Sequence, residues 1–183
     1  MQSLRRIVGS EASRYTVTKK LKRLFHKERG TLETDPKNVS RFQGNVVDFF
    51  DYVIAHEPSL NRYFVQRSTT LAKERKRNRN LFFRPIGLEI LARLYVHFTT
   101  NNSLSKLALG LERMNFQNPG GVSDGILWSA GRILAGAKEK TAALDLCLYI
   151  LGELHGEEEQ DLLERLREIK KDPSYALPKT VHV

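Results

Sequence analysis

Hydrophobic residues recur at helical spacing along most of this chain. In residues 16–29 the apolar positions follow the pattern i, i+4, i+7, i+8, and they are Val17, Leu21, Leu24 and Phe25. This spacing predicts one apolar stripe on an amphipathic helix. Gly30 follows directly and indicates the C-terminal end of that helix, because glycine accepts the left-handed backbone that often ends a helix.

A second helix is predicted to start at Asp35-Pro36, where an N-cap residue precedes a proline in the first helical position. It should end near His56, before Pro58. Its predicted inward face consists of Val39, Phe42, Val46, Phe49, Phe50, Val53 and Ile54. A shorter segment over residues 59–66 then contributes Leu60, Tyr63 and Phe64 to the core.

Helical periodicity continues through the second half of the chain. Pro85 should open a helix that reaches about Phe98, with Ile86, Ile90, Leu91, Leu94, Tyr95 and Phe98 inward. Asn102 or Ser103 should cap the next helix, and the Asn-Pro-Gly-Gly sequence at 118–121 predicts a turn. Further helices are predicted over ILWSAGRILAGA after Ser123 or Asp124, from Thr141, and over 157–171, before an extended tail.

No segment shows convincing strand alternation, and no internal repeat of useful length occurs. The predicted fold class is therefore all-α, a compact bundle of about seven or eight helices with short loops. A length of 183 residues suits a single domain, 1–183, with a buried core.

Composition narrows the class of protein. The chain is 40% hydrophobic and 28% charged, which is ordinary for a globular protein, and no apolar run approaches the roughly 18 residues of a membrane-spanning helix. The first residues lack the hydrophobic region of a secretion signal. Cys147 is the single cysteine, so an internal disulfide and a cysteine-based zinc site are excluded. We expect a cytoplasmic protein without membrane contact.

The net charge of +9 is unevenly distributed. Residues 1–84 hold 19 Lys and Arg against 8 Asp and Glu, a balance of +11, whereas residues 85–183 hold 11 against 13, a balance of −2. The chain therefore has a basic half, 1–84, and a near-neutral half, 85–183. Charge segregation of this kind is typical of a binding face, although surface lysines can also serve solubility alone.

The densest positive charge is the sequence KERKRNR at 73–79, which we name the basic segment. Lysine and arginine neutralise phosphates and release counterions, so a cluster of them predicts salt-sensitive binding to a nucleic-acid backbone. The predicted phosphate-binding residues are Lys73, Arg75, Lys76, Arg77, Arg79 and Arg84. The alternative is a solvated loop between two helices.

The N-terminal helix carries further positive charge beside its apolar stripe. Lys19, Lys20, Lys22 and Arg23 could support the same phosphate contacts. Anionic lipid attracts similar helices, but this apolar stripe is narrow and lacks tryptophan, so core packing explains the stripe better.

Residues that could support catalysis do not complete a site. Asp48 and Asp51 have no ligand or base nearby in sequence, and the five histidines are far apart. Gly120-Gly121 and Gly131-Arg132 lack the spacing of a phosphate-binding loop, and Trp128 is expected in the core. We therefore predict no catalytic residue, no metal site and no cofactor.

Three blocks of the near-neutral half and its junction resemble the C-terminal part of the DGQHR-domain family, which includes the DNA sulfur modification protein DndB. They are NLFFRPIGLEILARLY (80–95), GILWSAGRI (125–133) and LLERLREIKKDPSYALPKTV (162–181). In that family a basic stretch precedes an "LLFRPIGQ" type segment, an "LW..GR" helix, a Leu-rich helix and an "LP" tail. The corresponding positions here are 80–87, 127–132, 162–169 and Leu177-Pro178.

The resemblance covers 71–183, and 16–64 less clearly. It departs from the family where the naming Asp-Gly-Gln-His-Arg motif is absent and where Leu88 follows Gly87 in place of the expected Gln. It implies a C-terminal region or a shortened relative, and an association with DNA phosphorothioation or bacterial defence clusters.

The sequence thus predicts a DNA-associated, non-catalytic protein, a regulatory or accessory component of a DNA modification or defence system. We expect DNA rather than RNA as the nucleic acid, with a protein of a modification complex as a further partner. The alternative is a helical protein-interaction module whose basic face meets an acidic partner protein.

Overall fold

The computed structural model describes residues 36–66, 80–117 and 120–181. The predicted helix over 16–29 lies outside these residues. The chain divides into two compact units, one up to Asp51 and one from Tyr52 onward. The single domain expected from the sequence stays a prediction.

Helices dominate the described residues, as the sequence predicts. The described residues form six α-helices, one 3₁₀ helix and one pair of short strands. This is fewer helices than the seven or eight expected for the whole chain. In chain order these are α4 (Pro36–His56), α5 (Pro58–Phe64), η1 (Leu81–Phe83), α7 (Pro85–Thr100), α8 (Leu104–Arg113), β1 (Trp128–Ser129), β2 (Arg132–Ile133), α9 (Ala137–Ile150) and α10 (Glu157–Lys170).

Prolines fix the first of these boundaries. Helix α4 begins at Pro36 and ends at His56, as predicted, and Pro58 occupies the first turn of α5. Proline lacks the backbone N–H that a first-turn residue leaves unpaired, so it starts a helix at little cost. Within α4, Val53 is buried.

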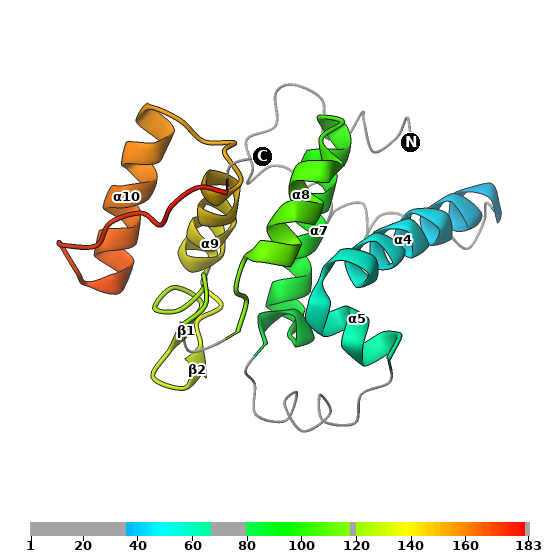
Figure 1. Ribbon diagram of the computed structural model, residues 1–183, viewed down its shortest axis with the longest axis horizontal. Helices are drawn as coiled ribbons and strands as arrows, with labels where there is room; N and C mark the ends of the chain where they lie inside the picture. The colour runs from blue at the N-terminus through cyan, green and yellow to red at the C-terminus, as the bar shows by residue number, and fades with distance from the viewer. Residues whose placement is uncertain (1–35, 67–79, 118–119, 182–183) are drawn as a thin grey trace. The chain divides into compact units, whose positions relative to one another are not determined.

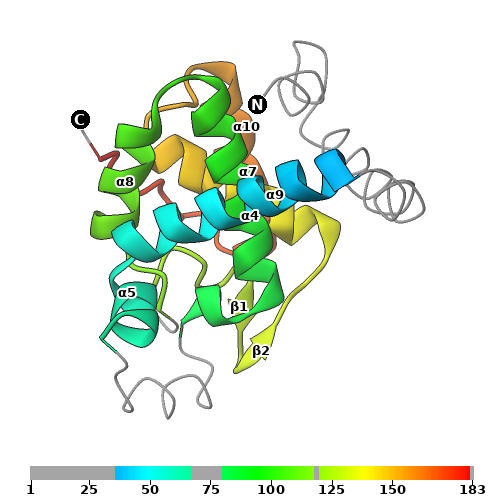
Figure 2. The same ribbon diagram turned by 90° about the vertical axis from the view of Figure 1, so that its right-hand side faces the viewer.

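Helix α7 is the centre of the second unit (Figures 1 and 2). It packs against η1, α8 and α9, while α10 packs on the other side of α9. The predicted inward face of α7 is largely confirmed: Ile86, Ile90, Leu91, Leu94 and Phe98 are all buried. Three neighbours surround this helix, so its apolar stripe supplies most of the contact between them.

The prediction of a helix over ILWSAGRILAGA is wrong, and so is the "LW..GR" helix that the resemblance implies, because a two-stranded hairpin forms there. Trp128 and Ser129 pair antiparallel with Ile133 and Arg132, respectively. Ala130 and Gly131 between them have φ of +49° and +77°, the backbone of a tight hairpin turn. Trp128 is half-buried on β1 rather than inside a helix. The fold is therefore mainly helical but not purely α.

Helix α9 starts at Ala137, earlier than the Thr141 predicted, and buries residues on most sides. Helix α10 spans nearly the range predicted. The extended tail after it also agrees with the sequence: the Val181 N–H donates to the Ile150 carbonyl at 2.7 Å. This bond returns the tail to the end of α9.

No helix among the residues that the structure describes is both long and apolar enough to cross a membrane.

Candidate nucleic-acid interface

Only one of the ten predicted phosphate-binding residues, Arg84, lies in a part of the chain that the structure describes. The other nine lie outside it and are Lys19, Lys20, Lys22, Arg23, Lys73, Arg75, Lys76, Arg77 and Arg79. The geometry available is therefore that of the residues on either side of the basic segment.

The residue directly after the basic segment, Asn80, is fixed in the protein interior. It is 7% exposed, and its side-chain oxygen accepts a hydrogen bond from the Phe82 N–H at 2.8 Å, which caps η1. The next N–H, of Leu81, donates to the Phe116 carbonyl at 3.1 Å. Phe82 packs against Phe116 with ring centroids 4.2 Å apart. The basic segment thus ends at a rigid anchor in the core.

A buried carboxylate holds the nearby start of α5. Glu57 is 4% exposed, and its Oε2 accepts a hydrogen bond from the Leu60 N–H at 2.6 Å. Burial raises the pKa of Glu57, and this effect is partly offset by the N–H groups of Leu60 and Ser59 and by the Ser59 and Asn80 side chains. The Asn80 side chain is close enough to Glu57 to lower its pKa, but the buried Nδ2 atom of Asn80 has no hydrogen-bond partner among the described residues. Glu57 is therefore a buried N-cap of α5, and it does not neutralise positive charge on the surface.

Arg84 joins η1 to α7 through its backbone. Its N–H donates to the Leu81 carbonyl at 3.0 Å, and its own carbonyl accepts from Gly87 and Leu88 at 3.0 and 3.1 Å. Its side chain, by contrast, forms no hydrogen bond or ion pair with any other described residue, and the first turn of α7 contains no acidic residue. The positive end of the helix dipole adds to the guanidinium charge there. Positive charge therefore gathers at this position.

Most cations of the near-neutral half are already paired within the protein. Five of its 11 Lys and Arg form ion pairs, namely Arg93, Lys106, Lys138, Lys140 and Arg165. Two more donate to carbonyl oxygens, namely Arg167 and Lys170. These seven side chains serve the fold. Arg84 has no such partner among the described residues, and neither do Arg113, Arg132, Lys171 and Lys179.

An aromatic cluster flanks the basic segment, and the sequence interpretation missed it. Tyr63 contacts Phe64 with ring centroids 4.9 Å apart and Phe83 with centroids 5.3 Å apart, both edge-on. The prediction that Phe64 points into the core is wrong: it is 53% exposed. Tyr63, one residue earlier, makes the contact with η1, and α5 ends at Phe64, so no element of the described ranges covers that ring. Aromatic residues beside a run of cations were the available signal.

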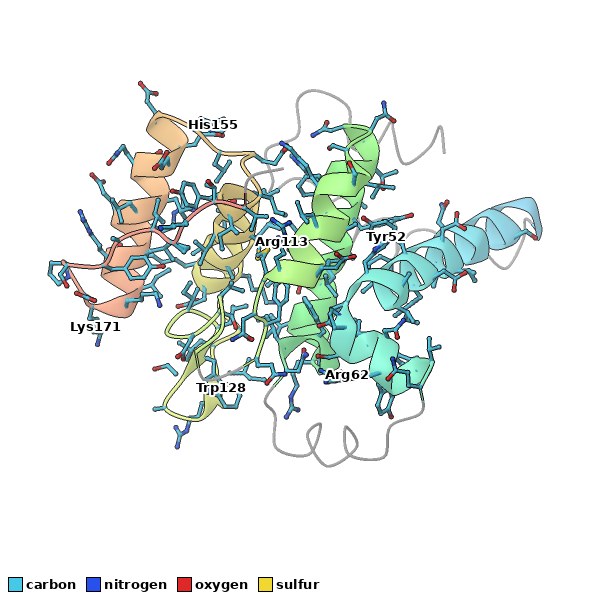
Figure 3. The ribbon with its side chains drawn as sticks, in the orientation of Figure 1. Tyr52, Arg62, Arg113, Trp128, His155 and Lys171 are labelled. Atoms are coloured by element: carbon cyan, nitrogen blue, oxygen red, sulfur yellow. The ribbon has the colours of Figure 1, made fainter. Side chains whose placement is uncertain are left out.

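One exposed arginine, Arg62, lies next to Tyr63 in sequence. Figure 3 shows Arg62 on α5, while His155 and Lys171 lie at the far side, beside α10. The Nε of Arg62 donates to the Pro58 carbonyl at 3.3 Å, which aligns its side chain along the helix. Arg62 and Arg84 are therefore adjacent in sequence to two rings of the aromatic cluster, Tyr63 and Phe83.

A concave site lies between the end of α4 and α8. Its volume is about 430 Å³, and it is lined by Tyr52, His56, Leu104, Ser105, Ala108, Leu109 and Glu112. The Tyr52 hydroxyl donates to the Leu104 carbonyl, and burial raises the pKa of Tyr52 to about 12. The His56 ring faces Glu112 at 3.5 Å. The tyrosine proton is thus held in a structural hydrogen bond, and no activated nucleophile is present among these lining residues.

Acidic and histidine side chains do not gather into a metal site in the described ranges, where no three His, Cys, Asp or Glu residues could hold an ion. Asp48 and Asp51 are both exposed on α4.

Comparisons with known proteins found no match to this chain. No family model matches the chain, and neither a curated protein nor a solved structure is similar to it.

Proposed function

We propose that this chain binds nucleic acid, DNA in preference to RNA, through its phosphate backbone, and that it has no catalytic centre of its own. The basic segment and Arg84 make the main contacts. Lys19, Lys20, Lys22 and Arg23 supply further positive charge.

The observation that supports this most is that the Arg84 side chain, next to the basic segment, has no acid or carbonyl partner among the described residues. In the near-neutral half, seven of 11 cations bind acids or carbonyls of the same chain. At the junction of the two halves, Arg84 has no such partner within the described structure, and the buried acid Glu57 is engaged as a helix cap. Positive charge that the fold does not use favours a polyanionic ligand.

The anchor at Asn80 supports the same function in a second way. Ordering a chain segment on binding costs conformational entropy, and a fixed end reduces that cost. Here the basic segment is followed at once by a buried cap and by a helix that begins at Pro85.

The resemblance to the DGQHR-domain family supports a place in DNA phosphorothioation or a related defence system, as a regulatory or accessory component. The resembling block 80–87 forms one local unit: a cap at Asn80, a 3₁₀ turn, Arg84, and a helix start at Pro85. Genes for DNA modification beside the gene of this protein would support that assignment, and their absence from related genomes would contradict it.

The direct test is a duplex-binding measurement over a range of salt. The logarithm of the binding constant should fall with the logarithm of salt, with a slope of about −0.9 for each phosphate neutralised. A variant with Arg75, Lys76, Arg77 and Arg79 changed to Gln should bind far more weakly, and its slope should be flatter by about 3 to 4 units.

A matched control removes the same charge elsewhere. Four exposed cations of the near-neutral half have no side-chain partner among the described residues, and they are Arg113, Arg132, Lys171 and Lys179. Changing Lys171 to Asn, which tolerates its φ of +54°, and the other three to Gln lowers the net charge equally. Equal weakening by both sets would indicate a general charge effect, and no duplex binding by the native chain at low salt would overturn the proposal.

A further inference from the structure

We propose that Phe64, supported by Tyr63 and Phe83, is a base-stacking surface that makes this interface prefer single-stranded nucleic acid, or the unpaired end of a duplex, over a continuous duplex. This inference rests on the proposed function and specifies its ligand.

The aromatic surface is held by ring contacts within the protein and is also exposed to solvent. Tyr63 is held between two rings, with Phe64 at 4.9 Å and an interplanar angle of 86°, and Phe83 at 5.3 Å and 67°. These edge-to-face contacts are the geometry that aromatic pairs prefer. The Phe64 ring is therefore supported on its Tyr63 side while 53% of the residue stays exposed. A base could stack on it without a rearrangement of the core.

Positive charge borders this surface in the sequence on both sides. Phe64 is followed, after two residues, by the stretch 67–79, which contains six Lys and Arg and one Glu, a balance of +5. That stretch leads through Asn80 to Phe83, and Arg84 follows directly. The exposed Arg62 stands on α5 before the cluster (Figure 3). Aromatic rings combined with a cationic backbone-binding segment are the usual composition of a single-strand site.

The preference for single strands follows from access to the bases. In a duplex the base faces are already stacked on one another, and the protein reaches phosphates and groove edges instead. Phosphate contacts do not distinguish the two forms strongly, so the basic segment alone would bind both. Stacking of one base on an aromatic side chain is worth about 1–3 kcal/mol, and only an unpaired base can provide it. Phe64 therefore adds affinity for single strands alone.

The test compares a single-stranded oligonucleotide with a duplex of the same length, by fluorescence anisotropy, for the native chain and Phe64→Ala. We expect the substitution to weaken single-strand binding by roughly 5- to 150-fold, the equivalent of one lost stacked base, and duplex binding by less than about twofold. The salt dependence should be unchanged, because no phosphate contact is removed. Phe64→Trp should retain single-strand binding.

Val65→Ala is the matched control, because Val65 is the next residue and is 62% exposed, but its side chain cannot stack. It should leave both affinities unchanged. A second readout uses an oligonucleotide with 2-aminopurine, whose fluorescence is quenched on stacking: the native chain should quench it and Phe64→Ala should not. Thermal unfolding of each variant confirms that the fold is retained.

Two results would overturn the inference while leaving the proposed function intact. One is equal loss of single-strand and duplex binding in Phe64→Ala, and the other is no loss of either. A third result, binding of neither nucleic acid by the native chain, would overturn the proposed function and the inference with it. Retention of the aromatic surface for a protein partner would then be the remaining explanation.

Discussion

Gly87 lies directly against the carbonyl group of Leu81: a Cβ atom added to Gly87 would stand 2.1 Å from that oxygen and 2.6 Å from its carbon. The neighbour is backbone, so it cannot rotate away. This close approach seats η1 on the first turn of α7 and so positions both Asn80 and Arg84. It gives a physical reason for a glycine at this position in the block that resembles the DGQHR-domain family.

Gly87→Ala should therefore destabilise the protein by about 3 kcal/mol, because the main chain of η1 must move away from α7. Urea unfolding measures this change. Gly44→Ala is the contrast: no atom lies within 4 Å of the added Cβ, and the position is exposed on α4. That substitution should stabilise α4 by roughly 0.5–1 kcal/mol, because alanine favours a helix more than glycine does. Similar effects at the two glycines would contradict the close contact.

Asn80→Ala should cost about 1–2 kcal/mol, because the Phe82 N–H loses its acceptor while it remains buried. Binding to a duplex should also weaken, since the basic segment loses its fixed end. The stability change is measured by chemical unfolding, and the binding change by anisotropy at a temperature where the variant is folded. Unchanged stability would show that the cap contributes nothing.

Glu57 should make the protein less stable as pH rises. Its pKa in the folded state lies above the ordinary 4.5, chiefly because of burial. The folded state therefore holds this proton over a pH range in which the unfolded state has lost it. Stability from this group is present below about pH 4.5 and is lost as pH rises through the folded pKa.

Glu57→Gln tests this directly, since the amide oxygen can still accept from the Leu60 N–H. The variant should lack that part of the fall in unfolding free energy between pH 4 and pH 7, measured by urea titration at each pH. A variant and a native chain that lose the same free energy over this range would rule out a raised pKa at Glu57.

Glu153 should produce the opposite dependence. Burial raises its pKa, but hydrogen bonds and charge from Lys106, at 2.7 Å, and His97, at 2.9 Å, outweigh burial and leave the pKa below 4.5. Stability from this group is present above about pH 4.5 and is lost as pH falls through the folded pKa.

The Glu153→Gln variant should be less stable than the native chain at pH 7, by roughly 1–3 kcal/mol, and the two should converge towards pH 3. Lys106→Met should reduce the same acid dependence, because it removes one of the two partners. A constant difference at every pH would mean that the loss comes from packing rather than from the ion pairs.

The helices whose first turns carry a strong local signal could be predicted from the sequence. Pro36 and Pro85 start helices where the pattern placed them, and the buried stripe of α7 follows its periodicity. These features depend on backbone chemistry that is local to a few residues.

Two features could not be predicted in that way. The hairpin at 128–133 has Ala130 and Gly131 in its turn, without the Asn-Gly or Asp-Gly pair that usually marks one, and its apolar residues also fit a helical spacing. The exposure of Phe64 depends on where η1 meets α5. Leu60 and Phe64 share a helix face, but the partner ring of Phe83 meets Tyr63 instead. Only the tertiary contact decides which ring is covered.

The same limit applies to the interface. Charge counting located a basic half, and Arg84 within it. The sequence could not show which cations form ion pairs or hydrogen bonds within the protein. That distinction depends on pairs far apart in the chain, such as Lys140 with Glu89 at 2.8 Å and Arg165 with Asp145 at 2.7 Å.

The reactivity of the single cysteine, Cys147, can report how often the core of this protein opens. Cys147 is 3% exposed on α9, and burial raises the pKa of its thiol to about 12. Thiolate is the reactive form, so a thiol reagent can modify Cys147 only when α9 separates from its neighbours. The rate of modification therefore measures how often the core opens, without any introduced probe. If nucleic acid steadies η1 against α7, that rate should slow when the ligand is present.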